Sequence, residues 1–124
     1  MSTWRRKALE FLPEYRVEID LTKSSGELWV EISSAFMRSV EQSNGEFVKG
    51  TLNYLAWCTS SEAGDEIQQS VYCGFLEDIT HNKKHWPLFS SWFSKVQFEK
   101  YKCSFKYALS KKEFTNLENM FYGK

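Results

Sequence analysis

Residues 24–45, SSGELWVEISSAFMRSVEQSNG, decide the fold class of this chain. Apolar side chains recur there every four residues, which places them along one face of an α-helix. They are Leu28, Ile32, Phe36 and Val40. Ser24 or Ser25 is in position to cap the N-terminus, and Glu27 falls in the first turn, where the helix dipole favours a carboxylate. Asn44-Gly45 is expected to end the helix.

The same periodicity predicts further helices on both sides of this one. They are expected over Thr3–Phe11, Glu46–Cys58, Asp65 to about Ile79, Trp86–Phe93 and Lys111–Tyr122. The polar run Ser60–Gly64 is expected to form a loop, and His81–Lys84 is expected to interrupt the helical pattern.

Two segments fit either a helix or a strand. In Glu14–Leu21 the apolar side chains alternate, so a strand competes with a helix that would begin at Pro13. Residues 96–109 also satisfy both patterns, and we favour a helix because a lone strand has no evident partner in this chain. The sequence therefore predicts one all-α domain over residues 1–124, a bundle of six to eight short helices.

Composition narrows the functional class. The chain has 124 residues, of which 42% are hydrophobic and 26% charged, a balance typical of a folded globular protein. Sixteen basic and sixteen acidic side chains cancel, which argues against a strongly basic nucleic-acid binder. No apolar run is long enough to span a bilayer, and Met1–Arg6 is polar, so we expect neither a membrane anchor nor a signal peptide.

The cysteine pattern indicates a reducing compartment. Cys58, Cys73 and Cys103 are odd in number, show no C-x-x-C spacing and lie among apolar residues. We expect buried free thiols in a cytoplasmic protein, with a single disulfide as the alternative.

The zero net charge hides an asymmetry along the chain. Residues 8–78 hold thirteen acids and four bases, a difference of 4 − 13 = −9, and the remainder holds twelve bases and three acids, a difference of 12 − 3 = +9. Differently solvated helix faces are the simplest explanation. The sharper hypothesis is an acidic surface that steers and binds a basic partner, because complementary potentials speed association and fix orientation.

Catalytic and cofactor motifs are missing from the sequence. The six glycines form no phosphate-binding loop, and no serine stands in a nucleophile elbow. The closest approach to a metal site is the group Cys73, Glu77, Asp78, His81 and His85. Two lysines in Asn82–Lys84 would repel a cation, so we interpret both histidines as solvated surface residues. The sequence thus predicts a protein without enzymatic activity, metal or cofactor.

The candidate binding residues are acidic, with an aromatic anchor. Glu62, Asp65 and Glu66 surround an expected helix start, where the dipole favours them. Glu77 and Asp78 stand near the end of the same helix, where the dipole disfavours them, so Glu77 either pairs with a base of the fold or faces a partner. A second cluster of acids is Glu27, Glu31, Glu41 and Glu46.

Exposed rings and a basic tail give further hypotheses. Because 21 aromatic side chains exceed what one small core hides, some are expected to be exposed for binding, and an aromatic-lined small-molecule pocket is the rival interpretation. The rings considered are Trp57, Tyr54, Trp86 and Trp92. RNA binding by the basic C-terminal third is a weaker hypothesis. Its residues are Lys95, Lys100, Tyr101, Lys102, Lys106, Tyr107, Lys111 and Lys112.

Two short motifs carry a resemblance to known proteins. They are Leu12-Pro13-Glu14-Tyr15, and Gly64-Asp65-Glu66-Ile67 followed by Phe75-Leu76-Glu77-Asp78-Ile79. Over about the first eighty residues the chain resembles small helical bacterial proteins, among them immunity proteins of contact-dependent growth inhibition and other polymorphic toxin systems. The resemblance implies a cytoplasmic all-α protein without catalysis.

The resemblance also implies a mechanism. An immunity protein binds its cognate secreted toxin domain one to one and occludes its active site, and many such toxins are nucleases with basic clefts. We expect the carboxylates of Glu62, Asp65, Glu66, Glu77 and Asp78 to pair with toxin bases, with the ring of Trp57 as anchor. The alternative is a small helical regulatory or protein-interaction module.

Overall fold

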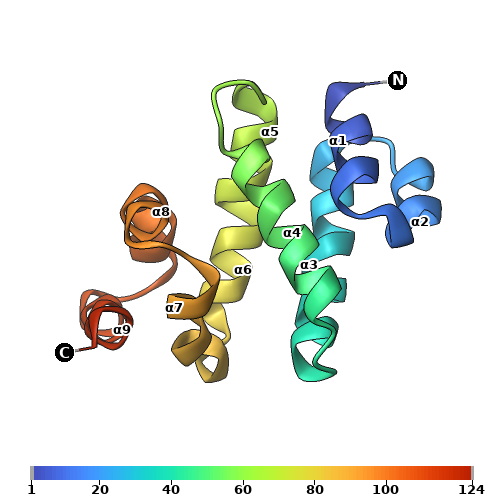
Figure 1. Cartoon of the computed structure of the whole chain (residues 1–124). Helices are drawn as coiled ribbons and strands as arrows, with labels where there is room; N and C mark the ends of the chain where they lie inside the picture. Colours follow the sequence, from blue (N-terminus) through green and yellow to red (C-terminus); the bar gives the residue numbers. More distant parts are fainter. Residues whose placement is uncertain (1, 124) are drawn as a thin grey trace. The chain divides into compact units, whose positions relative to one another are not determined.

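The computed structural model describes residues 2–123 and contains no strand within them. The helices follow one another from α1 near the N-terminus to α9 near the C-terminus (Figure 1). They are α1 (Thr3–Phe11), α2 (Arg16–Leu21), α3 (Ser25–Glu41), α4 (Gly45–Cys58), α5 (Asp65–Ser70), α6 (Leu76–His81), α7 (Phe89–Trp92), α8 (Lys95–Ala108) and α9 (Lys111–Tyr122). The all-α class is confirmed.

Three short helical turns complete this order: η1 (Pro13–Tyr15), η2 (Val71–Phe75) and η3 (Lys83–Leu88). The π-helical η2 follows α5 and precedes α6 without a loop. Counting α5 and α6 as one interrupted helix gives eight helices in residues 2–123, within the expected six to eight.

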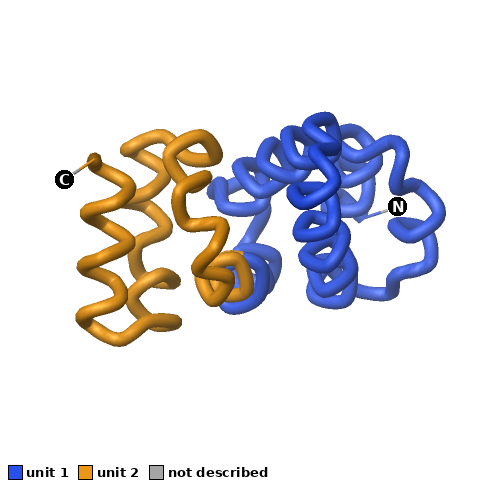
Figure 2. The backbone as a smooth tube through the Cα atoms, turned by 90° about the horizontal axis from the view of Figure 1, so that it is seen from below, with its two compact units in different colours: residues 1–75 blue, residues 76–124 orange. Residues whose placement is uncertain are grey.

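The chain divides into two compact units, residues 1–75 and 76–124 (Figure 2). The acidic side chains are concentrated in the first unit and the basic ones in the second. Unit 1 carries seven bases and eleven acids, 7 − 11 = −4, and unit 2 carries nine bases and five acids, 9 − 5 = +4. The single domain expected over 1–124 stays a prediction.

Helix α3 forms the centre of unit 1, as its periodicity predicts. The residues Leu28, Ile32 and Phe36 are fully buried. Beside them the Trp29 ring stacks on Tyr54 of α4, with centroids 5.3 Å apart, and contacts Phe75 at 5.0 Å. Large buried rings contribute most of the burial free energy of so small a core.

The N-terminus of α3 agrees with the prediction from sequence, and its C-terminus does not. Ser24 caps the N-terminus, since its hydroxyl accepts a hydrogen bond from the Glu27 amide at 3.1 Å. At the other end Ser43, not the Asn44-Gly45 pair, takes the left-handed conformation, with φ of 59°. Asn44 instead caps α4, because its side-chain oxygen accepts a hydrogen bond from the Phe47 amide. Asparagine is favoured both at helix ends and at N-caps, so the residue type alone did not decide its role.

Residues 14–21 are helical rather than extended. Helix α2 buries Ile19 and leaves Val17 and Leu21 exposed, whereas a strand would have placed all three on one face. The Arg5 guanidinium donates hydrogen bonds to the carbonyls of Ile19 and Thr22. The end of α2 is therefore fastened to α1 by carbonyls that a helix leaves unpaired.

Unit 2 is built on rings contributed mainly by α8 and α9. Phe98 is fully buried, stacks on Phe121 with centroids 4.1 Å apart, and contacts Phe105 at 5.2 Å. Residues 95–108 are helical, as we favoured, because a capping box fixes the start of α8: Ser94 accepts from the Gln97 amide and Gln97 accepts from the Ser94 amide.

The Glu113 carboxylate links α9 to η3, and its surroundings predict a loss of stability in acid. It accepts the Ser110 amide at 3.1 Å in a second capping box and forms an ion pair with Lys83. The Lys83 ammonium, followed by the Ser110 hydrogen bonds, lowers the pKa of Glu113 from its ordinary 4.5 to about 2. A carboxyl group whose pKa is lowered by folding stabilises the folded state at pH values above its ordinary pKa. This stabilisation is lost as the pH falls toward and through the pKa of the folded state.

We therefore expect Glu113→Gln to flatten the acid limb of the stability curve. Between pH 4.5 and pH 2 the wild-type chain should lose more stability than the variant, whose side chain does not titrate. Urea unfolding at a series of pH values, followed by circular dichroism, measures the difference. Identical pH dependence of the two chains would contradict the assignment.

Candidate functional site

A surface cavity of unit 1 gathers part of the expected acidic site. It has a volume of about 290 Å³ and lies where the loop after α4 leads into α5. Asp65 and Glu66 line it together with Ile67. Trp4 of α1 and Ser25 at the start of α3 also line the cavity. Glu62 is exposed in the same loop, two residues before Gly64.

The loop geometry explains why the acids stand at this edge. Gly64 has φ of 86°, a conformation that L side chains rarely adopt, and it immediately precedes α5. Within residues 2–123 the carboxylates of Glu62, Asp65 and Glu66 form no ion pair and no side-chain hydrogen bond. All three are exposed. Their charges are thus available to a ligand from solution.

Trp4 supplies the aromatic element of this cavity, although it was not among the rings expected to take part in binding. Its backbone carbonyl accepts a hydrogen bond from the Tyr54 hydroxyl at 2.9 Å, which ties α1 to α4. The Arg5 guanidinium lies 4.7 Å from its ring centroid. Trp4 and Asp65 line the same cavity although they are 61 residues apart in sequence, and no local pattern could have indicated this.

The expected acidic patch is divided between the two units. Asp65 and Glu66 belong to unit 1, whereas Glu77 and Asp78 lie on α6 in unit 2. Glu77 is half-buried and has no ion-pair partner within residues 2–123, so the expected internal base is missing there. Partial burial raises the pKa of Asp78, and the nearby His81 acts in the opposite direction. Of the five expected acids, Asp65 and Glu66 therefore line the cavity, and Glu62 is exposed in the loop that leads to it.

Trp57 differs from the exposed anchor that we expected. Its ring is half-buried and stacks on Tyr54 with centroids 6.3 Å apart, and its indole nitrogen is buried. Tyr54 is itself fully buried and Trp86 is 6% exposed, with its indole donating to the Thr80 carbonyl at 2.8 Å. These rings pack inside the two units. The units therefore bury more aromatic side chains than the length of the chain led us to expect.

The second acidic cluster is exposed but extends over two helices. Glu27 and Glu31 lie on the N-terminal half of α3, Glu41 is its last residue, and Glu46 is in the first turn of α4. The Glu31 carbonyl accepts a hydrogen bond from the Tyr15 hydroxyl at 3.3 Å. None of these four residues lines the cavity at Asp65.

The cysteines and histidines correct two expectations. Cys58 is buried, and burial raises the pKa of its thiol to about 12, but Cys73 and Cys103 are exposed. His81 is exposed as expected, whereas His85 is 5% exposed in the core of unit 2. Residues 2–123 contain no cluster of three or more His, Cys, Asp or Glu side chains that could hold a metal ion.

The basic C-terminal third offers less for RNA than its sequence suggests. Tyr101 is 1% exposed and so cannot stack on a base. Lys102 forms ion pairs with Glu99 and Glu118, both at 2.9 Å, which raise its pKa. Tyr107 is 81% exposed and remains as a stacking platform.

Within residues 2–123, no helix combines enough length with enough apolar character to cross a membrane. Comparison of the chain with protein families, with curated proteins and with solved structures gives no match.

Proposed function

We propose that the chain is an immunity protein that binds the basic face of a cognate toxin domain, one to one, and occludes its active site. One observation supports this most: the carboxylates of Asp65 and Glu66, unpaired within residues 2–123, share a cavity with the Trp4 indole. Carboxylates replace phosphates against arginine and lysine, and an indole face attracts a cation. Glu62 extends the same acidic edge.

A small helical fold without a catalytic centre is sufficient for this role. Inhibition by occlusion needs a preformed surface more than any reacting group, since rigid partners lose less conformational entropy on binding. The short motifs at residues 12–15, 64–67 and 75–79 that resemble toxin-system immunity proteins point the same way. A nuclease is the toxin class favoured by the charge, because its cleft must attract a polyanion.

The gene neighbourhood and a growth assay test the proposal. The DNA immediately upstream should encode a large exported protein with a variable C-terminal domain. Production of that domain in a host should arrest growth, and co-production of this chain should restore it. Failure to protect, with both proteins present and folded, would favour the alternative of a regulatory or interaction module with another partner.

Charge reversal then tests the site. We expect Asp65→Lys with Glu66→Lys to weaken toxin binding about a hundredfold or more, since each buried or close charge pair lost at an interface costs several kcal/mol. The stability of the free chain should fall by less than about 1 kcal/mol, because exposed first-turn carboxylates contribute only tenths each through the helix dipole. Isothermal titration calorimetry and thermal unfolding measure the two effects.

Glu14→Lys with Glu18→Lys is the matched control for this pair. Both residues are exposed acids in first helical turns of unit 1, and neither lines the cavity. The control changes the net charge by the same amount. Equal loss of affinity in the two double variants would indicate diffuse electrostatics, and equal loss of affinity and stability in the first would mark Asp65 and Glu66 as structural.

A further inference from the structure

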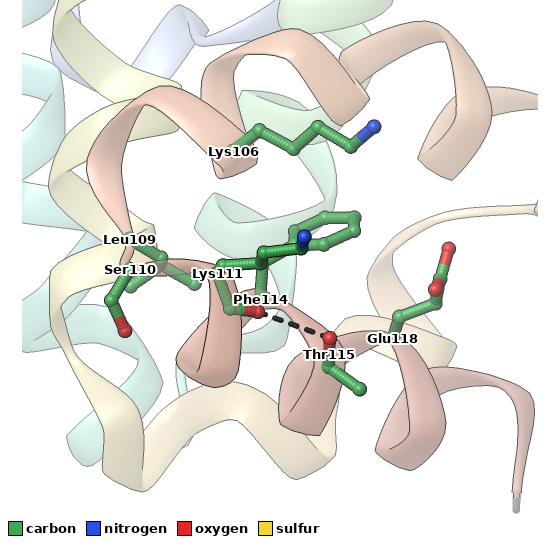
Figure 3. Close-up of a pocket in the computed structure, with 7 residues that line it drawn as sticks. All are labelled: Lys106, Leu109, Ser110, Lys111, Phe114, Thr115 and Glu118. Atoms are coloured by element: carbon green, nitrogen blue, oxygen red, sulfur yellow. Dashed lines mark hydrogen bonds between the residues drawn. The ribbon is translucent and has the colours of Figure 1, made fainter.

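A second cavity, in unit 2, has the opposite charge and does not depend on the proposed toxin site. It has a volume of about 450 Å³ and lies between the end of α8 and the first half of α9. Figure 3 shows Lys106 reaching over it from α8, with Phe114 and Thr115 on α9 below. Cavities of this volume lie within the range that holds small organic ligands.

The base of this cavity is apolar. Phe114 is 8% exposed, so most of its ring is packed into the unit, and Leu109 is half-buried beside it. The Lys106 ammonium lies 5.4 Å from the centroid of the Phe114 ring, held near the apolar base by cation–π attraction. A ligand that enters between the two helices therefore meets an aromatic ring and an ammonium group together.

The rim of the cavity carries a net positive charge. Glu118 is on the rim, but its carboxylate is bound to Lys102 at 2.9 Å, and Lys102 also binds Glu99. These three side chains sum to −1. Lys106 and Lys111 add +2 and have no carboxylate partner within residues 2–123. The local charge is thus 2 − 1 = +1.

A capping box already pairs two of the backbone amides at the start of α9. The Ser110 hydroxyl accepts from the Glu113 amide at 3.2 Å, and the Glu113 carboxylate accepts from the Ser110 amide. The residues that line the cavity include no arginine, so the forked guanidinium that holds a phosphate in two parallel hydrogen bonds is missing from its described lining. Two lysine point charges over an apolar base suit a smaller anion.

The geometry points to a binding site for an apolar group that carries a carboxylate. The apolar part would lie against Phe114 and Leu109, and the carboxylate would accept hydrogen bonds from the ammonium groups of Lys106 and Lys111. Such a ligand can be a free organic acid or the C-terminal residue of a peptide. Both present the same chemistry, and separate probes distinguish them.

Titration of the full chain with 4-phenylbutyrate tests the site. We expect saturable shifts of backbone amide resonances confined to residues 106–118, and binding at least tenfold weaker for the neutral 4-phenylbutyramide. N-acetyl-Ala-Phe with a free carboxylate, against its amidated form, gives the peptide arm. Saturable binding of either acid at this cavity supports the site, and the acid that binds more tightly indicates the source. Failure of both acids to bind there overturns the proposal.

Paired lysine variants separate the site from bulk charge. Lys106→Gln with Lys111→Gln should weaken binding of the acid at least tenfold, while Lys95→Gln with Lys100→Gln should leave it unchanged. All four lysines are exposed, and the control pair lies outside the cavity, so the two variants have equal net charge and intact cores. Equal loss in the two variants, or tighter competitive binding of adenosine monophosphate at these residues, would contradict the proposal.

Discussion

Phe98→Ala is expected to lower the free energy of unfolding of the protein by about 3–5 kcal/mol, the usual cost of removing a fully buried phenylalanine. The ring has no exposed surface and contacts Phe105, Phe121 and Tyr122, which come from both helices of the α8–α9 pair. Its loss leaves a cavity that aromatic neighbours fill poorly, because rings cannot bend into the space.

Urea unfolding followed by circular dichroism measures this loss, with Val96→Ala as the matched control. Val96 lies two residues earlier on α8 and is 78% exposed, so its truncation should change stability by less than about 0.5 kcal/mol. A loss below about 1 kcal/mol for Phe98→Ala would show that the stacked pair with Phe121 does not organise unit 2.

Gly50→Ala is expected to destabilise unit 1 by about 1–3 kcal/mol, although alanine is the better helix former. A methyl group at position 50 would stand 2.6 Å from the Phe11 carbonyl oxygen and 2.9 Å from a methyl carbon of Leu12. Both neighbours belong to the end of α1, which would have to move away from α4. Helix propensity alone predicts a gain of about 1 kcal/mol, so the sign of the effect tests the packing.

Gly45→Ala is the control, because the added methyl group meets no atom within 4 Å at the start of the same helix. We expect its stability to be unchanged or raised by a few tenths of a kcal/mol. The two variants should also differ at the acidic cavity, since α1 carries Trp4. A stabilising Gly50→Ala variant would contradict the close approach of α1 to α4.

The helices themselves follow from local sequence. The four-residue spacing in α3, the Ser24 cap and the Lys111–Tyr122 boundaries of α9 all matched, because each depends on neighbours within one or two turns. Helix α8 was favoured correctly over a strand. Local patterns failed where one residue type serves two roles, as at Asn44, which caps the following helix rather than ending the previous one.

By itself the sequence determined an all-helical chain and the exposed acids Glu62, Asp65 and Glu66, because periodicity and charge are local properties. Only the tertiary structure decided which rings are buried. It also decided that His85 is buried in unit 2 and that Cys73 and Cys103 are exposed. It also joined Trp4 to Asp65, and Lys106 to Phe114, in two cavities of opposite charge. The burial of a side chain depends on its contacts with several helices. The sequence of any one segment therefore does not determine it.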